Sequence, residues 1–303
     1  MIAIGGTNIV KAYLGSTGLA NIAIGDELLL SSGYPDNAIM TRETNPEVLA
    51  ICYAQGWCSN SSYMTDTEAA AVTSIGTVFY NNKNVTHFEE FEYFTSVTAI
   101  SANGFKGCTN LTTLTIPKNV TSLGNDSLRA SGIKTLVIKA LNISTWGNIY
   151  TFMDNVIEYF YCNSAKTGPI GARLTSLKTV VLDENVRTVG GFMNATLLTS
   201  VNIAEGSTTF GDNCFKNCSS LVSITLPSTT TTMTSGVFNT CANLTSVTIL
   251  ATNPPSGVNA YTFQNTPNAI VYVPDGSVST YQAASGWSRY ASRIKGISEL
   301  PTT

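Results

Sequence analysis

The feature that most constrains this chain is a segment that recurs about every 23 residues. It reads FKGCTNLTTLTIP from residue 105, FKNCSSLVSITLP from residue 215 and FNTCANLTSVTIL from residue 238. The apolar residues that anchor successive copies are Phe105, Leu128, Phe192, Phe215, Phe238 and Phe263. A fixed period of this length is typical of a solenoid, in which one repeat cannot bury its apolar face without its neighbours.

Each copy also carries the apolar template Leu-x-x-Leu-x-Ile, which predicts a short strand. The template begins at Leu111, Ile133, Leu177, Leu198, Leu221 and Leu244. Its inward side chains would stack on those of the next coil. We therefore predict a β-rich solenoid over residues 73–274. Residues 157–162 fit the template loosely and residues 163–176 are irregular, so we expect one distorted coil there.

Residues 1–30 contain a second and shorter repeat, in which Gly5, Gly15 and Gly25 are ten residues apart. Short apolar runs punctuated by glycine predict small strands joined by tight turns. Because 30 residues of this kind cannot form a core of their own, we expect a β segment that docks on another chain. A hairpin that caps the solenoid is the alternative. The candidate docking residues are Ile4, Ile9, Tyr13, Leu14, Leu19 and Ile24.

Two short helices are expected between the docking segment and the repeats. Residues 31–44 read as a linker, and Asn45 is predicted to N-cap a helix that starts at Pro46 and stops at Gly56. A second helix should start at Thr65 or Thr67. Residues 45–72 would then form the helical N-terminal cap that a solenoid requires. Residues 275–303 form the expected C-terminal cap and tail. Its short helical part would use Tyr281, Trp287, Tyr290 and Ile294.

The charge of the chain is low and unevenly distributed. Only 12% of the 303 residues are charged and the net charge is −3, which argues against a nucleic-acid partner. Residues 1–92 hold ten acidic and three basic groups, whereas residues 93–303 hold nine acidic and thirteen basic groups. A solvated acidic cap explains this asymmetry, and two different partners for the two halves are the alternative.

The start of the chain, MIAIGGTNIV, has no basic region followed by an apolar core, and no apolar run approaches the roughly 20 residues that span a bilayer. We therefore expect no secretory signal and no membrane insertion.

Residues with catalytic or metal-binding chemistry are few. The single histidine, His87, is flanked by apolar residues and is expected to be structural. On a strand Glu90 and Glu92 would share a face opposite Glu89, so a solvated acidic patch is favoured over a calcium site. No P-loop, GxSxG or paired CxxC motif occurs. We predict a non-enzymatic protein with no cofactor and no bound metal.

Three of the seven cysteines, Cys108, Cys218 and Cys241, lie three residues after a repeat anchor. In other copies the same position holds Ser131, Ala195 and Thr266. A position shared by these four residue types requires a small buried group. The pattern therefore predicts neither disulfides nor metal ligands.

The outward residues of the predicted strands are uncharged. β-Propensity partly explains a threonine-lined sheet, but Val137, Tyr159, Tyr161 and Val181 should adjoin across three coils. An exposed apolar and aromatic patch usually marks a contact site. The candidate partner-binding face also includes Thr113, Thr115, Thr179, Ser200 and Asn202.

The repeats resemble the BspA-like leucine-rich repeats of Bacteroidetes and their phages. The resemblance is carried by FEYFTSVTAISANGFKGCTNLTTLTIP at 91–117, by the copies from residues 215 and 238, and by VYVPDGSVSTYQAASGW near the end, and it covers about residues 45–297. It implies a leucine-rich-repeat solenoid. The KAYLGST motif within residues 1–30 is similar to N-terminal segments of phage virion and tail proteins.

These resemblances imply a phage virion structural protein of the head or tail fibre type, assembled in the host cytoplasm. Its N-terminus would dock on other virion proteins or on its own copies, with a homotrimer as one such assembly. Its solenoid would adhere to a host surface protein or glycan. The alternative is a bacterial cell-surface or secreted adhesin.

Overall fold

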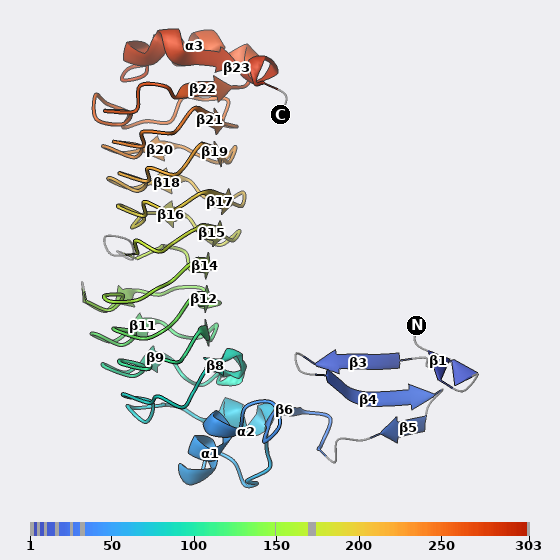
Figure 1. Ribbon diagram of the computed structural model, residues 1–303. Coiled ribbons are helices and arrows are strands. Elements are labelled where there is room, and N and C mark those ends of the chain that lie inside the picture. The colour runs from blue at the N-terminus through green and yellow to red at the C-terminus, as the bar shows by residue number, and fades with distance from the viewer. Residues whose placement is uncertain are drawn as a thin grey trace. The chain divides into compact units, whose positions relative to one another are not determined.

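The structure is a computed structural model that describes residues 3–4, 7–8, 11–15, 18–24, 27–30, 34–148, 150–168 and 174–301. The chain divides into two compact units, Met1–Ala71 and Val72–Thr303 (Figure 1).

The first unit contains the small strands expected from the ten-residue repeat. An antiparallel pair joins β1 (Ala3–Ile4) and β2 (Thr7–Asn8). A three-stranded antiparallel sheet has the order β3-β4-β5, with the bounds Lys11–Gly15, Gly18–Ile24 and Glu27–Leu30. The segment expected to be a linker contains β6 (Ala38–Thr41), which pairs with β7 (Tyr63–Thr65). The linker prediction was therefore wrong for these residues, because the apolar run around the buried Met40 extends into a paired strand.

Both predicted helices of this unit are present. Helix α1 (Pro46–Ala54) ends before Gly56, which has a φ of 70° that favours glycine. The Asn45 side chain makes no capping hydrogen bond, contrary to expectation. Helix α2 (Asp66–Ala71) begins with a capping box, in which Thr65 Oγ1 accepts from the Glu68 amide and the Glu68 carboxylate accepts from the Thr65 amide. Capping of the solenoid by these helices stays a prediction, since they belong to a different compact unit from the solenoid.

The second unit is a stack of parallel β coils, as the repeat predicts. Six strands form one parallel sheet, and a four-stranded parallel sheet follows it along the chain (Figure 1). The first sheet contains β8 (His87–Phe88), β10 (Thr113–Ile116), β12 (Thr135–Ile138), β14 (Tyr159–Cys162), β15 (Thr179–Leu182) and β17 (Ser200–Ile203). The second contains β19 (Ser223–Leu226), β21 (Ser246–Ile249), β22 (Ile270–Val273) and β23 (Ile294–Gly296).

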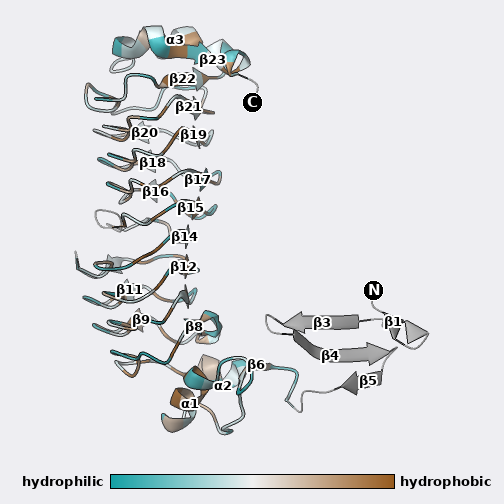
Figure 2. Ribbon diagram, viewed as in Figure 1, coloured by the Kyte–Doolittle hydropathy of each residue, from teal (hydrophilic) through white to brown (hydrophobic). Residues whose placement is uncertain are grey.

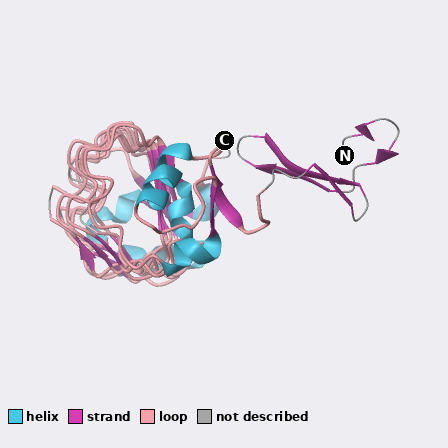
Figure 3. Cartoon of the chain, turned by 90° about the horizontal axis from the view of Figure 1, so that it is seen from below, coloured by secondary structure: helices cyan, strands magenta, loops and turns pink. Residues whose placement is uncertain are grey.

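Shorter strands pair on another side of the coils. They form two three-stranded parallel sheets, β9-β11-β13 and β16-β18-β20. Their bounds are Ala99–Ile100, Ser122–Leu123 and Thr145–Trp146 for the first, and Thr188–Val189, Thr209–Phe210 and Thr232–Met233 for the second. Successive coils superpose when the stack is seen end-on (Figure 3). The hydrophobic stretches recur at the same place in successive coils (Figure 2).

The coil that was expected to be distorted is regular in its strand. All four residues of β14 pair in register with β12 and β15. The irregular stretch lies after this strand, and residues 169–173 within it are outside the described part of the chain. The loose fit of residues 157–162 to the template is explained by aromatic residues, since Phe160 takes the buried position that a leucine or valine takes in other coils.

The repeat anchors form a spine of stacked phenylalanines in the core. Phe192, Phe215 and Phe238 are fully buried, and their ring centroids are 5.7 and 5.9 Å apart. Phe238 also stacks on Phe263, at 5.6 Å. Parallel rings at this spacing follow directly from the fixed period, because each coil returns its anchor to the same place.

The small residue three positions after the anchor is buried, as predicted, and forms a hydrogen bond with the preceding coil. The Cys218 thiol donates to the carbonyl of Phe192 at 3.3 Å, and the Cys241 thiol donates to that of Phe215 at 3.0 Å. Thr266 Oγ1 makes the same bond to Phe238, at 2.6 Å. The position thus requires a small buried residue, and where that residue is Cys218, Cys241 or Thr266 its side chain also satisfies an anchor carbonyl within the core.

The end of the stack is closed by η3 (Asp275–Ser277), α3 (Val278–Ala283), η4 (Ser288–Arg293), β23 and η5 (Ile297–Glu299). The expected closing side chains are buried, and three of them donate to carbonyls of the last coils: Tyr281 to Ala251 at 2.7 Å, Trp287 to Pro255 at 2.8 Å and Tyr290 to Asn259 at 2.7 Å. Among the described residues of this segment, only the six of α3 are α-helical, so the closure depends more on these hydrogen bonds and on β23 than on a helix.

Candidate partner-binding face

The register of the parallel sheet aligns the outward residues of successive strands in two rows. The first row is His87, Thr113, Thr135, Tyr159, Thr179 and Ser200. The second row is Thr115, Val137, Tyr161, Val181 and Asn202. All nine residues of the candidate face therefore lie in these rows, because a period of two places alternate residues on one side of a strand.

Four of these residues form what we call the strand-face patch: Val137, Tyr159, Tyr161 and Val181. Val137 pairs with Tyr161, and Tyr161 pairs with Val181, across neighbouring strands. Neighbouring strands are about 4.8 Å apart, so the three side chains adjoin. All four members of the patch are half-buried, which leaves part of each side chain open to solvent.

Tyr161 is held in place by Asp183. Its hydroxyl donates a hydrogen bond to the Asp183 carboxylate at the end of the next coil. Burial, together with this hydrogen bond, raises the pKa of Tyr161 above its ordinary value, so the phenol stays protonated and remains a donor. Because the hydroxyl already has a partner, the aromatic ring is the part of this side chain that remains for an apolar contact.

The candidate face is not open along its whole length. Thr115 was expected to be exposed but is only 5% exposed. The residues after β8 were expected to continue as a strand, but Glu89–Tyr93 form the 3-10 helix η1, which packs against β10 and accounts for the burial of Thr115. At the other end Ser200 and Asn202 are exposed, where the six-stranded sheet ends and β19 begins the next.

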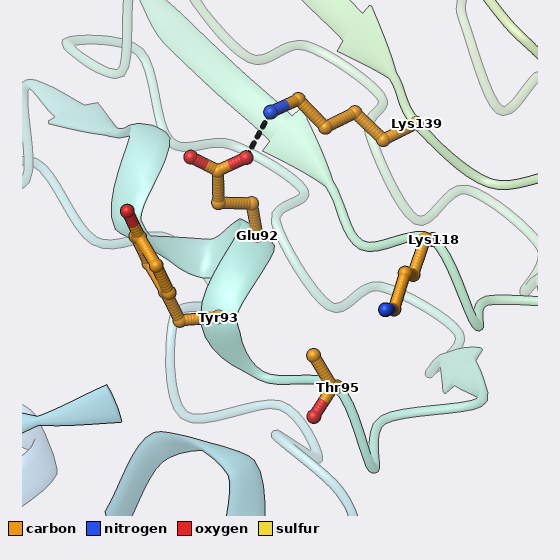
Figure 4. A pocket seen from close by; sticks show the side chains of 5 residues that line it. All are labelled: Glu92, Tyr93, Thr95, Lys118 and Lys139. Carbon is orange, nitrogen blue, oxygen red and sulfur yellow. Dashed lines mark hydrogen bonds and ion pairs between the residues drawn. The ribbon is translucent and has the colours of Figure 1, made fainter. Parts of the chain in front are cut away.

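The helix η1 also borders a pocket of about 340 Å³, which we call the lysine pocket. It is lined by Glu92, Tyr93, Thr95, Lys118 and Lys139. In Figure 4 the Lys139 side chain reaches the Glu92 carboxylate, with which it forms an ion pair. The Lys118 ammonium points into the space on the same side of η1, whereas the Tyr93 ring points away from both lysines.

Sequence reasoning did not predict this pocket. The sequence does contain a signal for Lys139. It lies two residues after Val137, so strand alternation places both side chains on the outward side. The contribution of Glu92 has no such signal, because it depends on residues 89–93 folding as a 3-10 helix rather than as a strand.

His87, Glu89 and Glu90 form a second group of polar side chains on and beside η1. One potential ligand atom from each of these residues lies within 4.8 Å of the others. Thr86 Oγ1 lies 3.1 Å from His87 Nδ1. Carboxylates at a surface commonly lie this close without a metal, so we assign no site to this group. Glu92, which the calcium alternative would need, is instead paired with Lys139.

The candidate docking residues are located only in part. Ile4, Tyr13, Leu14, Leu19 and Ile24 belong to strands β1, β3 and β4, and their side chains lie outside the described part of the chain. Ile9 lies outside it entirely. The docking role of residues 1–30 therefore stays a prediction.

No helix within the described residues has the length and apolar character needed to cross a bilayer.

The sequence pattern of the family described as "BspA type Leucine rich repeat region" matches the chain over residues 69–169 and 170–283. These ranges contain every residue of the strand-face patch and of the lysine pocket. They do not include residues 1–30, on which the virion interpretation depends, and that interpretation stays a prediction. No curated protein matches the chain.

Among solved structures, 21 chains match. One is a leucine rich cell surface protein from Faecalibacterium prausnitzii A2-165, at 18% identity and a TM-score of 0.41, covering 69% of this chain and 65% of that one. Leucine-rich repeat proteins from Bacteroides ovatus and Eubacterium ventriosum match at 16% and 17% identity with TM-scores of 0.35 and 0.30. These matches cover 75% and 65% of this chain and 84% and 69% of those chains. The chain thus spans slightly less than two thirds of the first protein.

Proposed function

Because this chain belongs to the BspA-type leucine-rich repeat family, we propose that it is a non-enzymatic adhesion protein that binds a partner through the outward face of its strands. The observation that carries the proposal is the register of β12, β14 and β15, which brings Val137, Tyr161 and Val181 together. Aromatic side chains set among apolar neighbours are typical of the centre of a protein interface.

A binding role also agrees with how the polar groups of the solenoid are used. The Tyr161 hydroxyl is bonded to Asp183, and the thiols of Cys218 and Cys241 are buried and bonded to backbone carbonyls. Burial raises the pKa of Cys241 to about 12, so this thiol is protonated and unreactive at neutral pH. Nucleophilic chemistry would require an accessible thiolate, which these buried thiols do not provide.

We place this adhesion protein at a bacterial cell surface. The support is family membership, since the resemblance of the repeats to BspA-like proteins implies a surface adhesin and extends over residues 69–283. The virion alternative depends mainly on the resemblance of residues 1–30 to phage virion and tail proteins. The two locations make different predictions for one culture: peptides of this chain in the envelope fraction support the surface role, and peptides in density-purified phage particles, at the ratio of minor structural proteins, would replace it with the virion role.

The binding face is tested by replacing Tyr159 and Tyr161 together with lysine. A lysine at position 161 can form an ion pair with Asp183, so we expect the solenoid to remain folded while the patch becomes charged. The matched control is Tyr261→Lys, since Tyr261 is 56% exposed and lies outside the strand face.

The full chain and both variants would be applied to an array of surface proteins and glycans. We expect the double variant to lose the partner that the wild-type chain and the control bind, with circular dichroism unchanged in all three. Equal binding by the double variant would show that the partner uses another surface.

A further inference from the structure

The lysine pocket has an excess of positive charge. Glu92 and Lys139 form an ion pair, and the exposed fractions of their side chains are 30% and 47%. The Lys118 ammonium makes no hydrogen bond or ion pair with any residue that the structure describes. Within the described part of the chain the pocket therefore has one unpaired cation, and an unpaired ammonium beside a pocket attracts an anionic group.

The pocket already contains a carboxylate, that of Glu92. Lys139 follows β12 and Glu92 lies in η1, so this ion pair joins two elements that are 47 residues apart in the sequence. A carboxylate therefore fits at this position. A second carboxylate could pair with Lys118, or could take the place of Glu92 on Lys139.

The lysine pocket and the strand-face patch share one strand and its continuation. Lys139 lies two residues after Val137, so both are on the outward side of the same strand and its continuation. Lys118 follows β10, the neighbouring strand. A partner that covers Val137 and Tyr161 would therefore have its edge over the two lysines. An apolar and aromatic centre with a charged rim is the usual composition of a protein–protein interface.

We propose that the lysine pocket binds an aspartate or glutamate carboxylate of a protein partner whose apolar residues cover the strand-face patch. This inference rests on the proposed function and adds the chemistry of the partner to it. A protein segment is favoured over an acidic glycan because the patch contains the aliphatic side chains Val137 and Val181 beside its tyrosines. Aliphatic surface is matched by apolar residues of a protein rather than by the hydroxyls of a sugar.

The proposal can be tested with short probes that combine acidic and apolar residues. Binding of acetyl-(Glu-Leu)3-amide to the full chain would be measured by calorimetry and compared with acetyl-(Gln-Leu)3-amide, which has the same shape but no carboxylate. A heparin hexasaccharide serves as the acidic glycan. We expect the Glu peptide to bind about tenfold more tightly than the Gln peptide, the size expected for one new charge pair that is partly shielded from water.

Three variants locate the effect. Lys118→Glu should remove the preference for the Glu peptide, because it replaces the unpaired cation with a negative charge. Glu92→Gln should strengthen binding of the Glu peptide several-fold, because it frees Lys139. Lys166→Glu is the matched control. Lys166 is exposed and bridges Thr188 of the separate sheet that contains β16, so this variant makes the same charge change away from the pocket and should keep the preference.

Several results would overturn the proposal: no measurable binding of the Glu peptide at millimolar concentration, equal binding of both peptides, or a preference that survives Lys118→Glu. Tighter binding of heparin that Lys118→Glu abolishes would also overturn it, and would assign the pocket to an acidic glycan. A partner that depends on Tyr159 and Tyr161 but not on Lys118 would leave the proposed function intact and refute only this inference.

Discussion

Phe215 lies at the middle of the phenylalanine spine, and its replacement by alanine tests whether the spine holds the repeats together. Its side chain is fully buried, with a ring 5.7 Å from that of Phe192 and 5.9 Å from that of Phe238. The variant removes apolar surface from the core and leaves a cavity between the rings of Phe192 and Phe238. The backbones of the neighbouring coils keep these two rings apart, so they cannot close the cavity.

The expected loss of unfolding free energy is about 4 kcal/mol. Lost burial and the cavity left by Phe→Ala together cost roughly 3–5 kcal/mol. Each lost aromatic pair is worth about 0.5–1.5 kcal/mol, and part of this pair energy is already included in the first range. A domain is stable by only about 5–15 kcal/mol. In a solenoid each coil is stabilised mainly by its neighbours, so the loss falls on the interfaces on both sides of Phe215.

Urea unfolding followed by far-ultraviolet circular dichroism would measure this change. We expect a lower midpoint and a broader transition, because the coils before and after Phe215 become less strongly coupled. Leu197→Ala is the control. Leu197 is 49% exposed and belongs to the preceding coil, so its loss should cost about 0.5 kcal/mol or less. A loss below about 2 kcal/mol for Phe215→Ala would refute the view that the spine couples the coils.

Two further predictions concern buried polar groups. Burial raises the pKa of the Cys108 thiol from 9.0 to about 11. The unfolded chain therefore loses this proton at lower pH than the folded chain does. The stability that the buried thiol contributes is fully present below pH 9 and should fall by up to about 1.4 kcal/mol per pH unit as the pH rises toward 11. Urea titrations at pH 8, 9 and 10 should show a shallower decline in unfolding free energy for Cys108→Ala than for the wild type, and equal slopes would contradict the assignment. The Arg293 guanidinium donates to the carbonyls of Thr266 and Ala269 at 2.6 and 2.7 Å. Arg293→Ala should lower the unfolding free energy by about 2 kcal/mol and reduce amide-exchange protection in β22 and β23. Unchanged protection there would show that the closing segment does not need this residue.

Much of the solenoid could be predicted because its period is visible in the sequence. The anchors at Phe192, Phe215 and Phe238 indicated stacked coils, and the alternation around Val137 and Tyr161 indicated which side chains share a face. Both are local periodic patterns, and a parallel in-register stack converts them directly into neighbours in space. The cysteine position was interpreted correctly as small and buried, although the thiol-to-carbonyl hydrogen bond with the preceding coil was not foreseen.

The errors occurred where a segment departs from the period. Glu89–Tyr93 was treated as strand, yet it forms a 3-10 helix. Alternation along its own strand predicted that Thr115 is exposed, whereas it is buried where that helix packs against the strand. Residues 38–41 were assigned to a linker but form a strand, since a four-residue apolar run has no period that distinguishes it from a loop.

By itself the sequence determined the repeated coil, its anchors and the uncharged character of its outward strand face, because each of these depends only on residues at fixed spacing within one repeat. Only the tertiary structure decided that Glu92 meets Lys139 and that Lys118, beside them, has no hydrogen-bond or ion-pair partner among the residues that the structure describes. Those relations join residues from three different coils, and they depend on how a non-repeating helix packs over the sheet. Spacing along the chain specifies a repeat, but it does not specify a contact that occurs only once.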